Sequence, residues 1–241
     1  MSPRQPAILA SYLSERRDQI DSRLAAIADD ESIPPVLAVA IEQALSSRGK
    51  RLRGVLTVSV GEACGLRAEK VLDAACAFEM IHTSSLIIDD LPALDDAEMR
   101  RGEPALHRTF GEDLAILTAV ALLNHAYGLI SRNHSSIAPR RWTHDVLLQR
   151  VVDAVGWNGT IGGEAVDLHS GREALDFQTL EYIHSRKTGA LFVASSAAGA
   201  MLANASTGVL HAVEAYAKNL GLAFQITDDI LDATSTVEEL G

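Results

Sequence analysis

The sequence is poor in the residues that mark several protein classes. Only two of its 241 residues are cysteines, which is too few for a disulfide scaffold. Aromatic residues make up 5% of a chain that is 47% hydrophobic, and this favours alanine- and leucine-rich helices over a β-sandwich. Lys and Arg number 21 against 32 Asp and Glu, so the chain lacks the basic surplus of a nucleic-acid-binding protein. We therefore expect a helical protein without a nucleic-acid partner.

The sequence also lacks a clear membrane signal. Its first 20 residues contain no continuous apolar run, so no secretory signal is predicted. Residues 189–210 carry no formal charge and are about long enough to cross a bilayer. Their many small residues, without an aromatic or basic belt, favour a buried core helix instead. We expect no transmembrane segment and a cytoplasmic location.

Helical periodicity extends through almost the whole chain. Apolar residues recur at i, i+3, i+4 spacing in the segments 5–28, 36–47, 50–64, 68–90, 112–133, 140–168, 176–203 and 209–232. No alternating run is long enough to predict a strand, and no linker or repeat divides the chain. The sequence predicts one all-α domain over residues 1–241. Because the last residues leave a helix without a closing element, we expect that a C-terminal part is missing.

Two acidic clusters punctuate these helices, DDLPALDD at 89–96 and DDILD at 228–232. In the second, Asp228 and Asp232 lie four residues apart and share one helix face. In the first, Asp89 and Asp95 cannot share a face of a straight helix. Pro92 should end or bulge the helix before it, so that Asp95 folds back towards Asp89. Either cluster alone could be a solvated helix end, but two sets of hard oxygen ligands suit Mg2+.

Basic residues form three short, separated clusters along the chain. GKRLRG at 49–54 is expected to open a helix, Arg100 and Arg101 follow the first acidic cluster, and RKTG at 186–189 is expected to break a helix. Guanidinium and ammonium groups bind phosphate oxygens, so acids that recruit Mg2+ beside such cations predict a diphosphate site. Taken singly, Arg51 and Arg186 are interpreted as surface charges.

In their order along the chain, these motifs resemble those of the trans-isoprenyl diphosphate synthases, or polyprenyl synthetases. The resemblance runs through GKRLRG at 49–54, EMIHTSSLIIDDLPALDDAEMRRGEPALHRTFGE at 79–112, GGEAVDL at 162–168, YIHSRKTGAL at 182–191 and GLAFQITDDILD at 221–232. It implies a single-domain bundle of long helices around a deep central cavity. It also implies a prenyltransferase that condenses an allylic diphosphate with isopentenyl diphosphate head-to-tail. The apolar helices further suggest a homodimer.

The resemblance also implies roles for individual residues. Up to three Mg2+ would be held on the allylic diphosphate by Asp89, Asp90, Asp95, Asp228, Asp229 and Asp232. Isopentenyl diphosphate would be bound by Lys50, Arg53, His82 and Arg101. The allylic diphosphate would be bound by Arg100, Lys187, Thr188 and Gln225. All these aspartates except Asp232 are predicted to be catalytic, together with Lys187. The residues alone leave simpler interpretations open: His82 as a core histidine, Thr188 as a helix cap, and Gln225 as the partner of a buried backbone group.

Two small residues set the expected product length. Ser84 and Ser85 lie about one helical turn before Asp89, where relatives that stop at fifteen carbons commonly carry an aromatic residue. This resemblance predicts geranylgeranyl diphosphate first and farnesyl diphosphate second, and Tyr or Phe at position 84 should shorten the product.

Three alternatives remain open. The family usually has His where Ile88 stands and Gly-Asp where Ala119 and Val120 stand, so a catalytically weak or silent synthase subunit is possible. A terpene cyclase would share the first cluster but not DDILD. The pairs Glu79-x-x-His82 and Glu181-x-x-His184 are typical of a di-iron carboxylate bundle, which would make no use of the aspartate clusters.

Overall fold

The computed structural model describes residues 4–47, 49–170 and 176–234. Within these ranges, the side chains of 4–6, 228, 229 and 232–234 lie outside the described part. The chain divides into two compact units, residues 1–59 with 67–133 and residues 60–66 with 134–241. Each unit is described by itself.

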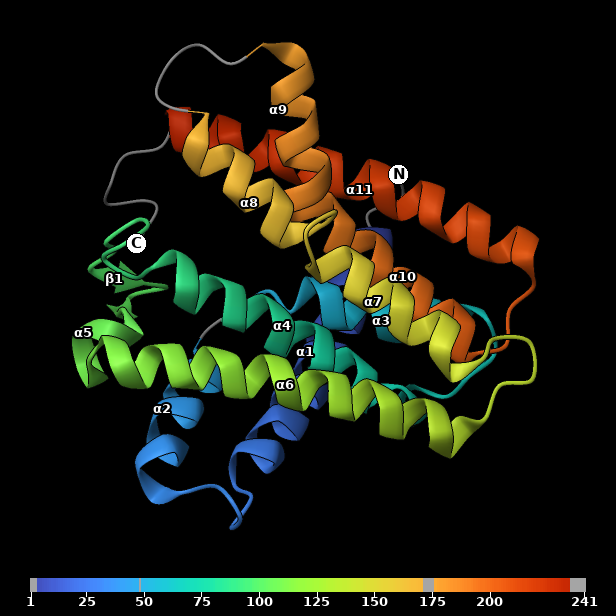
Figure 1. Ribbon diagram of the computed structural model, residues 1–241. Helices are drawn as coiled ribbons and strands as arrows, with labels where there is room; N and C mark the ends of the chain where they lie inside the picture. The colour runs from blue at the N-terminus through green and yellow to red at the C-terminus, as the bar shows by residue number, and fades with distance from the viewer. Residues whose placement is uncertain (1–3, 48, 171–175, 235–241) are drawn as a thin grey trace. The chain divides into compact units, whose positions relative to one another are not determined.

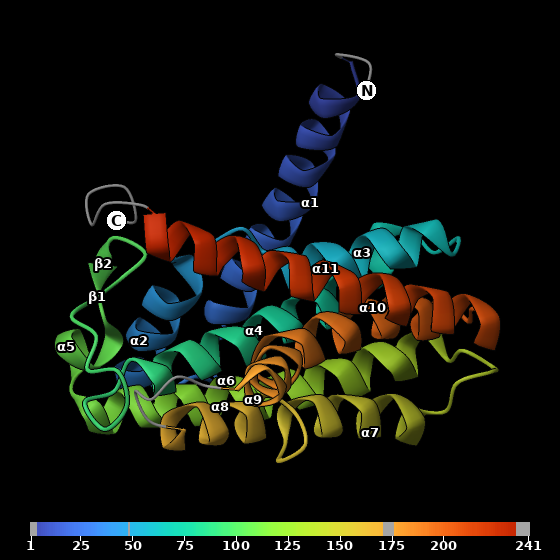
Figure 2. The same ribbon diagram turned by 90° about the horizontal axis from the view of Figure 1, so that it is seen from above.

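Most of the described residues are helical, and their only strands are two short ones, which confirms the predicted all-α class (Figures 1 and 2). The elements are α1 Arg4–Ala28, α2 Pro35–Ser46, α3 Leu52–Ala63, the 3-10 turn η1 Ala68–Lys70, α4 Leu72–Asp89, β1 Met99–Arg100, β2 Glu103–Pro104, α5 Leu106–Phe110, α6 Glu112–Ile137, α7 His144–Val155, α8 Thr160–His169, α9 Phe177–Ile183, the π-helical segment η2 His184–Gly189, α10 Ala190–Leu202 and α11 Thr207–Thr234.

In the first unit, α1 packs on α2 and α4, and α2 packs on α4 and α5. Ile20 and Leu24 of α1 are buried, as are Phe78 and Met80 of α4. Helix α4 is apolar on nearly every side, as expected of a helix enclosed by its neighbours. Its C-terminal half runs beside α6, where the Ser84 hydroxyl donates to the Ala119 carbonyl at 2.8 Å (Figure 1). This burial fixes the end of α4, from which the first acidic cluster starts.

A small hairpin in this unit was not predicted. Strands β1 and β2 pair antiparallel, with Arg100 opposite Glu103. Arg101 (φ 55°) and Gly102 (φ 84°) form the connection, and both lie in the left-handed region. This is the geometry of a two-residue type I′ turn, which matches the twist of paired strands. Strands of two residues are too short to show an alternating pattern.

In the second unit, α10 packs against α7, α11 and η2. Most of α10 is buried, including Phe192 and Met201, which favours the core-helix interpretation of the uncharged segment 189–210. That segment is not one helix, because α10 ends at Leu202 and α11 begins at Thr207. The expected helix 140–168 is likewise divided into α7 and α8, at a turn that contains Gly156 and Gly159.

One of the described helices, α6, is long and apolar enough to cross a bilayer by its length and composition. A core helix of a soluble protein satisfies the same test. Several α6 residues are buried, among them Ala115, Ala119, Leu122 and Ala126. The result is therefore weak support for a membrane span.

Candidate active site

The first acidic cluster folds back on the helix that carries it. Helix α4 ends at Asp89, and the Asp95 amide donates to the Asp89 carbonyl at 3.0 Å. The Ala97 amide donates to the carbonyl of Asp90 at 3.1 Å. Pro92 lies within this loop, as the sequence predicted. The expected helix end and fold-back are confirmed, and they bring the backbone of Asp95 to that of Asp89.

Asp90 points inward, against a basic residue of the hairpin. Its side chain is almost fully buried, and Arg100 Nε lies 2.9 and 3.1 Å from its two carboxylate oxygens. A further bond joins Arg100 Nη2 to Asp90 Oδ1. The hydrogen bond with Asp90 outweighs burial and raises the pKa of Arg100. The metal role of Asp90 stays a prediction, but its position favours orienting Arg100.

The next residue, Arg101, faces His82. Its Nη2 lies 3.4 Å from His82 Nε2, and its Nη1 lies 3.4 Å from Ser47 Oγ. Burial and the nearby cation of Arg51 lower the pKa of Arg101. Burial, followed by the charges of Arg53 and Arg101, lowers the pKa of His82 well below its usual value. His82 is therefore a neutral imidazole near neutral pH, surrounded by cations.

The N-terminal end of α3 brings further cations to this place. Arg51 and Arg53 are 4% and 8% exposed. The interpretation of Arg51 as a surface charge is thus wrong. Its Nη1 atom is buried and has no hydrogen-bond partner. Buried cations are costly unless they are paired, so this cluster suits an anion with several oxygens, such as a diphosphate. Lys50, also predicted to bind there, is exposed and directly precedes Arg51.

The two serines of the expected cavity floor differ in their surroundings. Ser84 is 5% exposed and donates to α6, whereas Ser85 is half-buried and donates to the carbonyl of His82 at 2.9 Å. An aromatic residue at position 84 would therefore have to displace α6, while position 85 has more space.

In the second unit, GGEAVDL lies against RKTG. A Cβ atom on Gly163 would lie 2.3 Å from the backbone nitrogen of Lys187, so only glycine permits this approach of α8 to η2. The Lys187 ammonium is 2.7 Å from Glu164 Oε2 and 2.7 Å from Asp167 Oδ2. Burial alone lowers the pKa of Lys187, but these two carboxylates raise it well above its usual value. The lysine is therefore a permanent cation and not a proton acceptor.

Sequence reasoning missed Glu164 and Asp167. Both lie in a motif that was quoted for the resemblance, and their i, i+3 spacing places them on one helix face. No feature of the sequence indicated that Lys187 would lie opposite them.

Thr188 and Gln225, both predicted to bind the allylic diphosphate, lie together. The Thr188 hydroxyl donates to Gln225 Oε1 at 2.9 Å. RKTG does not break the helix as expected, because residues 184–189 form a π-helical turn continuous with α9 and α10. π-Helical turns occur often at functional sites. Thr188 is thus not a helix cap.

The second acidic cluster follows on the same helix as Gln225. Helix α11 continues to Thr234, so the backbone of Asp228, Asp229 and Asp232 is helical as predicted. The side chains of these three residues lie outside the described part.

The polyprenyl synthetase family model matches residues 34–241. The chain belongs to this family. It is accordingly a prenyltransferase.

Individual relatives agree with the family match. The chain is 42% identical over 238 residues to the geranylgeranyl diphosphate synthase of Cyanophora paradoxa, covering 97% of this chain and 77% of that protein. It is 37% identical over 230 residues to the farnesyl diphosphate synthase of Geobacillus stearothermophilus, covering 95% of this chain and 77% of the relative. The crystal structure of an FPP/GFPP synthase from Zymomonas mobilis matches with a TM-score of 0.86 and 32% identity, covering 95% of this chain and 83% of the other.

Membership of the polyprenyl synthetase family implies a divalent metal ion, and the aspartate carboxylates of the first acidic cluster are ligands that suit Mg2+. Among the described residues, no group of three or more His, Cys, Asp or Glu side chains could hold a metal by itself. Mg2+ is usually held by one or two carboxylates together with water and substrate phosphates, so it needs no such group. A di-iron centre does need one, and the Glu79 carboxylate already accepts from the Gly54 amide at 2.8 Å.

Proposed function

We propose that this polyprenyl synthetase condenses an allylic diphosphate with isopentenyl diphosphate head-to-tail, with Mg2+ as cofactor. The observation that carries the proposal is the set of guanidinium groups around neutral His82, directly beside the aspartate-rich loop. Such a buried cationic cluster suits the diphosphate of a substrate. The names of the two synthase relatives support the same reaction.

In this proposal, Lys50, Arg53, His82 and Arg101 bind isopentenyl diphosphate. Because His82 is neutral, its Nε2 accepts from Arg101 and orients that guanidinium without adding charge. The left-handed backbone of Arg101 then turns its side chain from the hairpin towards α4. Backbone strain of this kind is often stored at binding sites.

The allylic diphosphate is assigned to Arg100, Lys187, Thr188 and Gln225. Asp90 holds Arg100 in one orientation, and the pair Glu164 and Asp167 holds Lys187. Asp89, Asp95, Asp228, Asp229 and Asp232 are the proposed Mg2+ ligands, with Asp90 a weaker candidate. When bound, Mg2+ would neutralise the leaving diphosphate. The residues themselves bind and orient the two diphosphates.

The proposed product is geranylgeranyl diphosphate, with farnesyl diphosphate as the second candidate. Ser84 and Ser85 are small, so neither would stop a chain of fifteen carbons that grows along α4. Relatives of both product names are similar to this chain, so this choice rests on the two serines.

Three further features belong to the proposal. Residues 1–241 act as one domain, since the family match runs through both units.

The protein forms a homodimer, because α6 exposes Ile116, Leu117 and Val120. Sedimentation velocity would measure the oligomeric state. A cytoplasmic location stays a prediction.

The reaction is tested with purified protein, Mg2+, isopentenyl diphosphate and each of three allylic primers, dimethylallyl, geranyl and farnesyl diphosphate. We expect Mg2+-dependent release of diphosphate and a twenty-carbon product by mass spectrometry. Arg101→Gln should abolish most activity, whereas Arg17→Gln, which alters an exposed ion pair on α1, should not. A folded protein that extends no primer would contradict the proposal and favour the silent-subunit alternative.

A further inference from the structure

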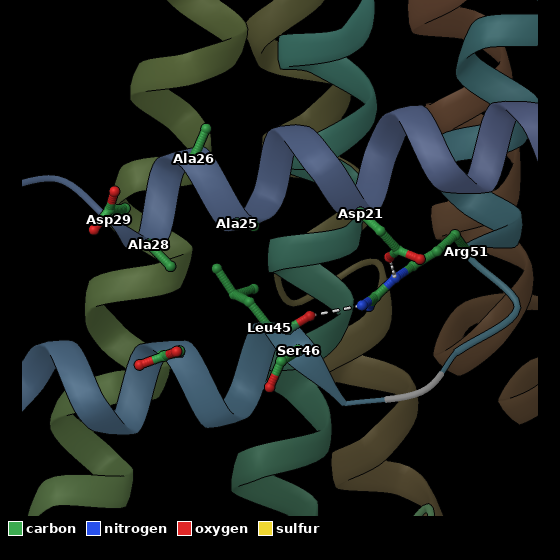
Figure 3. A pocket seen from close by; sticks show the side chains of 9 residues that line it. Asp21, Ala25, Ala26, Ala28, Asp29, Leu45, Ser46 and Arg51 are labelled. Carbon is green, nitrogen blue, oxygen red and sulfur yellow. Dashed lines mark hydrogen bonds and ion pairs between the residues drawn. The ribbon is translucent and has the colours of Figure 1, made fainter.

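Arg51 lies between the two residues of GKRLRG that are proposed to bind isopentenyl diphosphate, but its own side chain turns into the protein. Its Nε atom lies 2.7 Å from Asp21 Oδ1 on α1. Its Nη2 atom donates to the Leu45 carbonyl at 2.6 Å and to the Ser47 carbonyl at 3.1 Å, at the end of α2. Figure 3 shows the Arg51 side chain directed between α1 and α2, towards Asp21 and the Leu45 carbonyl. One guanidinium thus ties the start of α3 to two other helices.

The backbone of Arg51 is consistent with such a tie. Its φ is 48°, in the left-handed region that side-chain-bearing residues seldom occupy. The Arg51 carbonyl accepts from the Val55 amide at 2.8 Å and so begins the hydrogen bonding of α3. This conformation costs free energy, and the buried hydrogen bonds of the guanidinium compensate for it. Without them, we expect the segment before Leu52 to relax.

Through Ser47, the contacts of Arg51 extend to Arg101, one of the residues proposed to bind isopentenyl diphosphate. Arg51 holds the carbonyl of Ser47, and the hydroxyl of Ser47 lies 3.4 Å from Arg101 Nη1. The buried Nη1 atom of Arg51 and the Nη1 atom of Arg101 both lie near Gly49, because a Cβ atom on Gly49 would be 3.6 Å from the first and 2.9 Å from the second. A connected set of contacts therefore runs from Asp21 to Arg101, which faces His82.

We propose that Arg51 is a positioning residue of the isopentenyl diphosphate site, fixing the segment that carries Lys50 and Arg53 and the placement of Arg101. The inference rests on the proposed function. Arg51 acts through its neighbours, because three of its contacts are directed to Asp21 and the end of α2. Its effect should therefore fall on the binding of one substrate, isopentenyl diphosphate, and spare the allylic one.

The test is steady-state kinetics with each substrate titrated separately against a saturating concentration of the other. Arg51→Met should raise the KM for isopentenyl diphosphate about tenfold or more, since it removes several buried charge-assisted hydrogen bonds. The KM for the allylic diphosphate should change by less than about threefold. Arg51→Lys should resemble Arg51→Met, because an ammonium group keeps the charge but cannot contact Asp21 and both carbonyls at once. Asp21→Asn should produce a smaller change in the same direction.

The matched control is Arg23→Met. Arg23 lies on α1, as Asp21 does, and forms an ion pair of the same length, 2.7 Å from its Nε to Asp73 Oδ1. Asp73 is not among the residues proposed to bind isopentenyl diphosphate. Neither KM should change in this variant. If Arg51→Met proves insoluble, Arg51→Lys and Asp21→Asn carry the test.

Two results would overturn the inference while leaving the proposed function intact. One is an unchanged KM for isopentenyl diphosphate in every folded Arg51 and Asp21 variant, with only kcat falling in proportion to the folded fraction. The other is full recovery by Arg51→Lys, which would show that only the charge matters. A wild-type protein that incorporates no isopentenyl diphosphate would instead refute the proposed function, and this inference with it.

Discussion

The close approach of Gly163 to Lys187 predicts a severe effect of one added methyl group. Gly163→Ala would place a Cβ atom 2.3 Å from the Lys187 nitrogen, 2.9 Å from its Cα and 3.0 Å from the Arg186 carbonyl carbon. All three are backbone atoms, so no side-chain rotation can relieve the contact. To reach an ordinary contact of 3.4 Å, the nitrogen would have to retreat by 1.1 Å, the difference between 3.4 and 2.3 Å.

This retreat should affect both stability and catalysis. Overpacking a well-filled contact typically costs about 1 to 3 kcal/mol, and rigid backbone on both sides favours the upper end of that range. For a chain of this size, about 3 kcal/mol corresponds to roughly 6 to 12 °C in Tm. Because Lys187 is proposed to bind the allylic diphosphate, a displacement of about 1 Å should lower kcat/KM roughly a hundredfold.

The measurements are thermal or urea unfolding and steady-state kinetics with the allylic substrate titrated. Gly208→Ala is the matched control, since it makes the same change in a helix of the same unit, and a Cβ atom there would meet nothing within 4 Å. Its stability should change by less than about 1 kcal/mol and its activity should not change. Equal stability of the two variants would show that α8 and η2 do not approach as closely as described, and would refute the reasoning.

Three other predictions follow from the site. The free energy of unfolding should fall as the pH drops below about 6.5. In that range the unfolded chain binds a proton at His82, whereas the folded protein does not, because its His82 pKa is lowered. Urea unfolding at a series of pH values measures this, and the dependence should be weaker in His82→Asn. Thr188→Val should raise the KM for the allylic diphosphate about three- to tenfold, because it removes the hydroxyl that contacts Gln225. Thr188→Ser keeps the hydroxyl and should keep the wild-type KM. Equal KM values for the two variants would contradict the role of that hydroxyl. Ser84→Phe and Ser85→Phe should both shorten the product seen by mass spectrometry. Ser84→Phe should also lower stability, because Ser84 is enclosed against α6. An unchanged product from the Ser85 variant, which is easier to accommodate, would show that these serines do not limit product length.

Local rules allowed part of the site to be predicted from the sequence. Proline cannot continue the hydrogen bonding of a helix, so Pro92 implied both the end of α4 and the return of Asp95 towards Asp89. The diphosphate site inferred from the neighbouring acids and arginines stays a prediction, because it rests on the chemistry of these side chains alone. The predicted helices 5–28, 36–47, 50–64 and 68–90 lie close to the observed bounds of α1, α2, α3 and α4.

Features that depend on distant partners could not be predicted. Arg51 was interpreted as exposed because nothing near it in sequence shows that Asp21 lies opposite. The pairing of Lys187 with Glu164 and Asp167 joins two segments about twenty residues apart. Periodicity also cannot distinguish a broken helix from a π-helical turn, because both interrupt the same pattern.

The π-helical turn at residues 184–189 accommodates one residue more than a regular helical turn would. Each residue of an α-helix rotates the chain by about 100°, so deleting a single residue here would restore regular winding and swing α9 around its axis relative to α10. Lys187 could then no longer face α8 while Thr188 faces α11. In a lineage of such proteins, this short segment should tolerate exchanges of side chains far better than any change in its length.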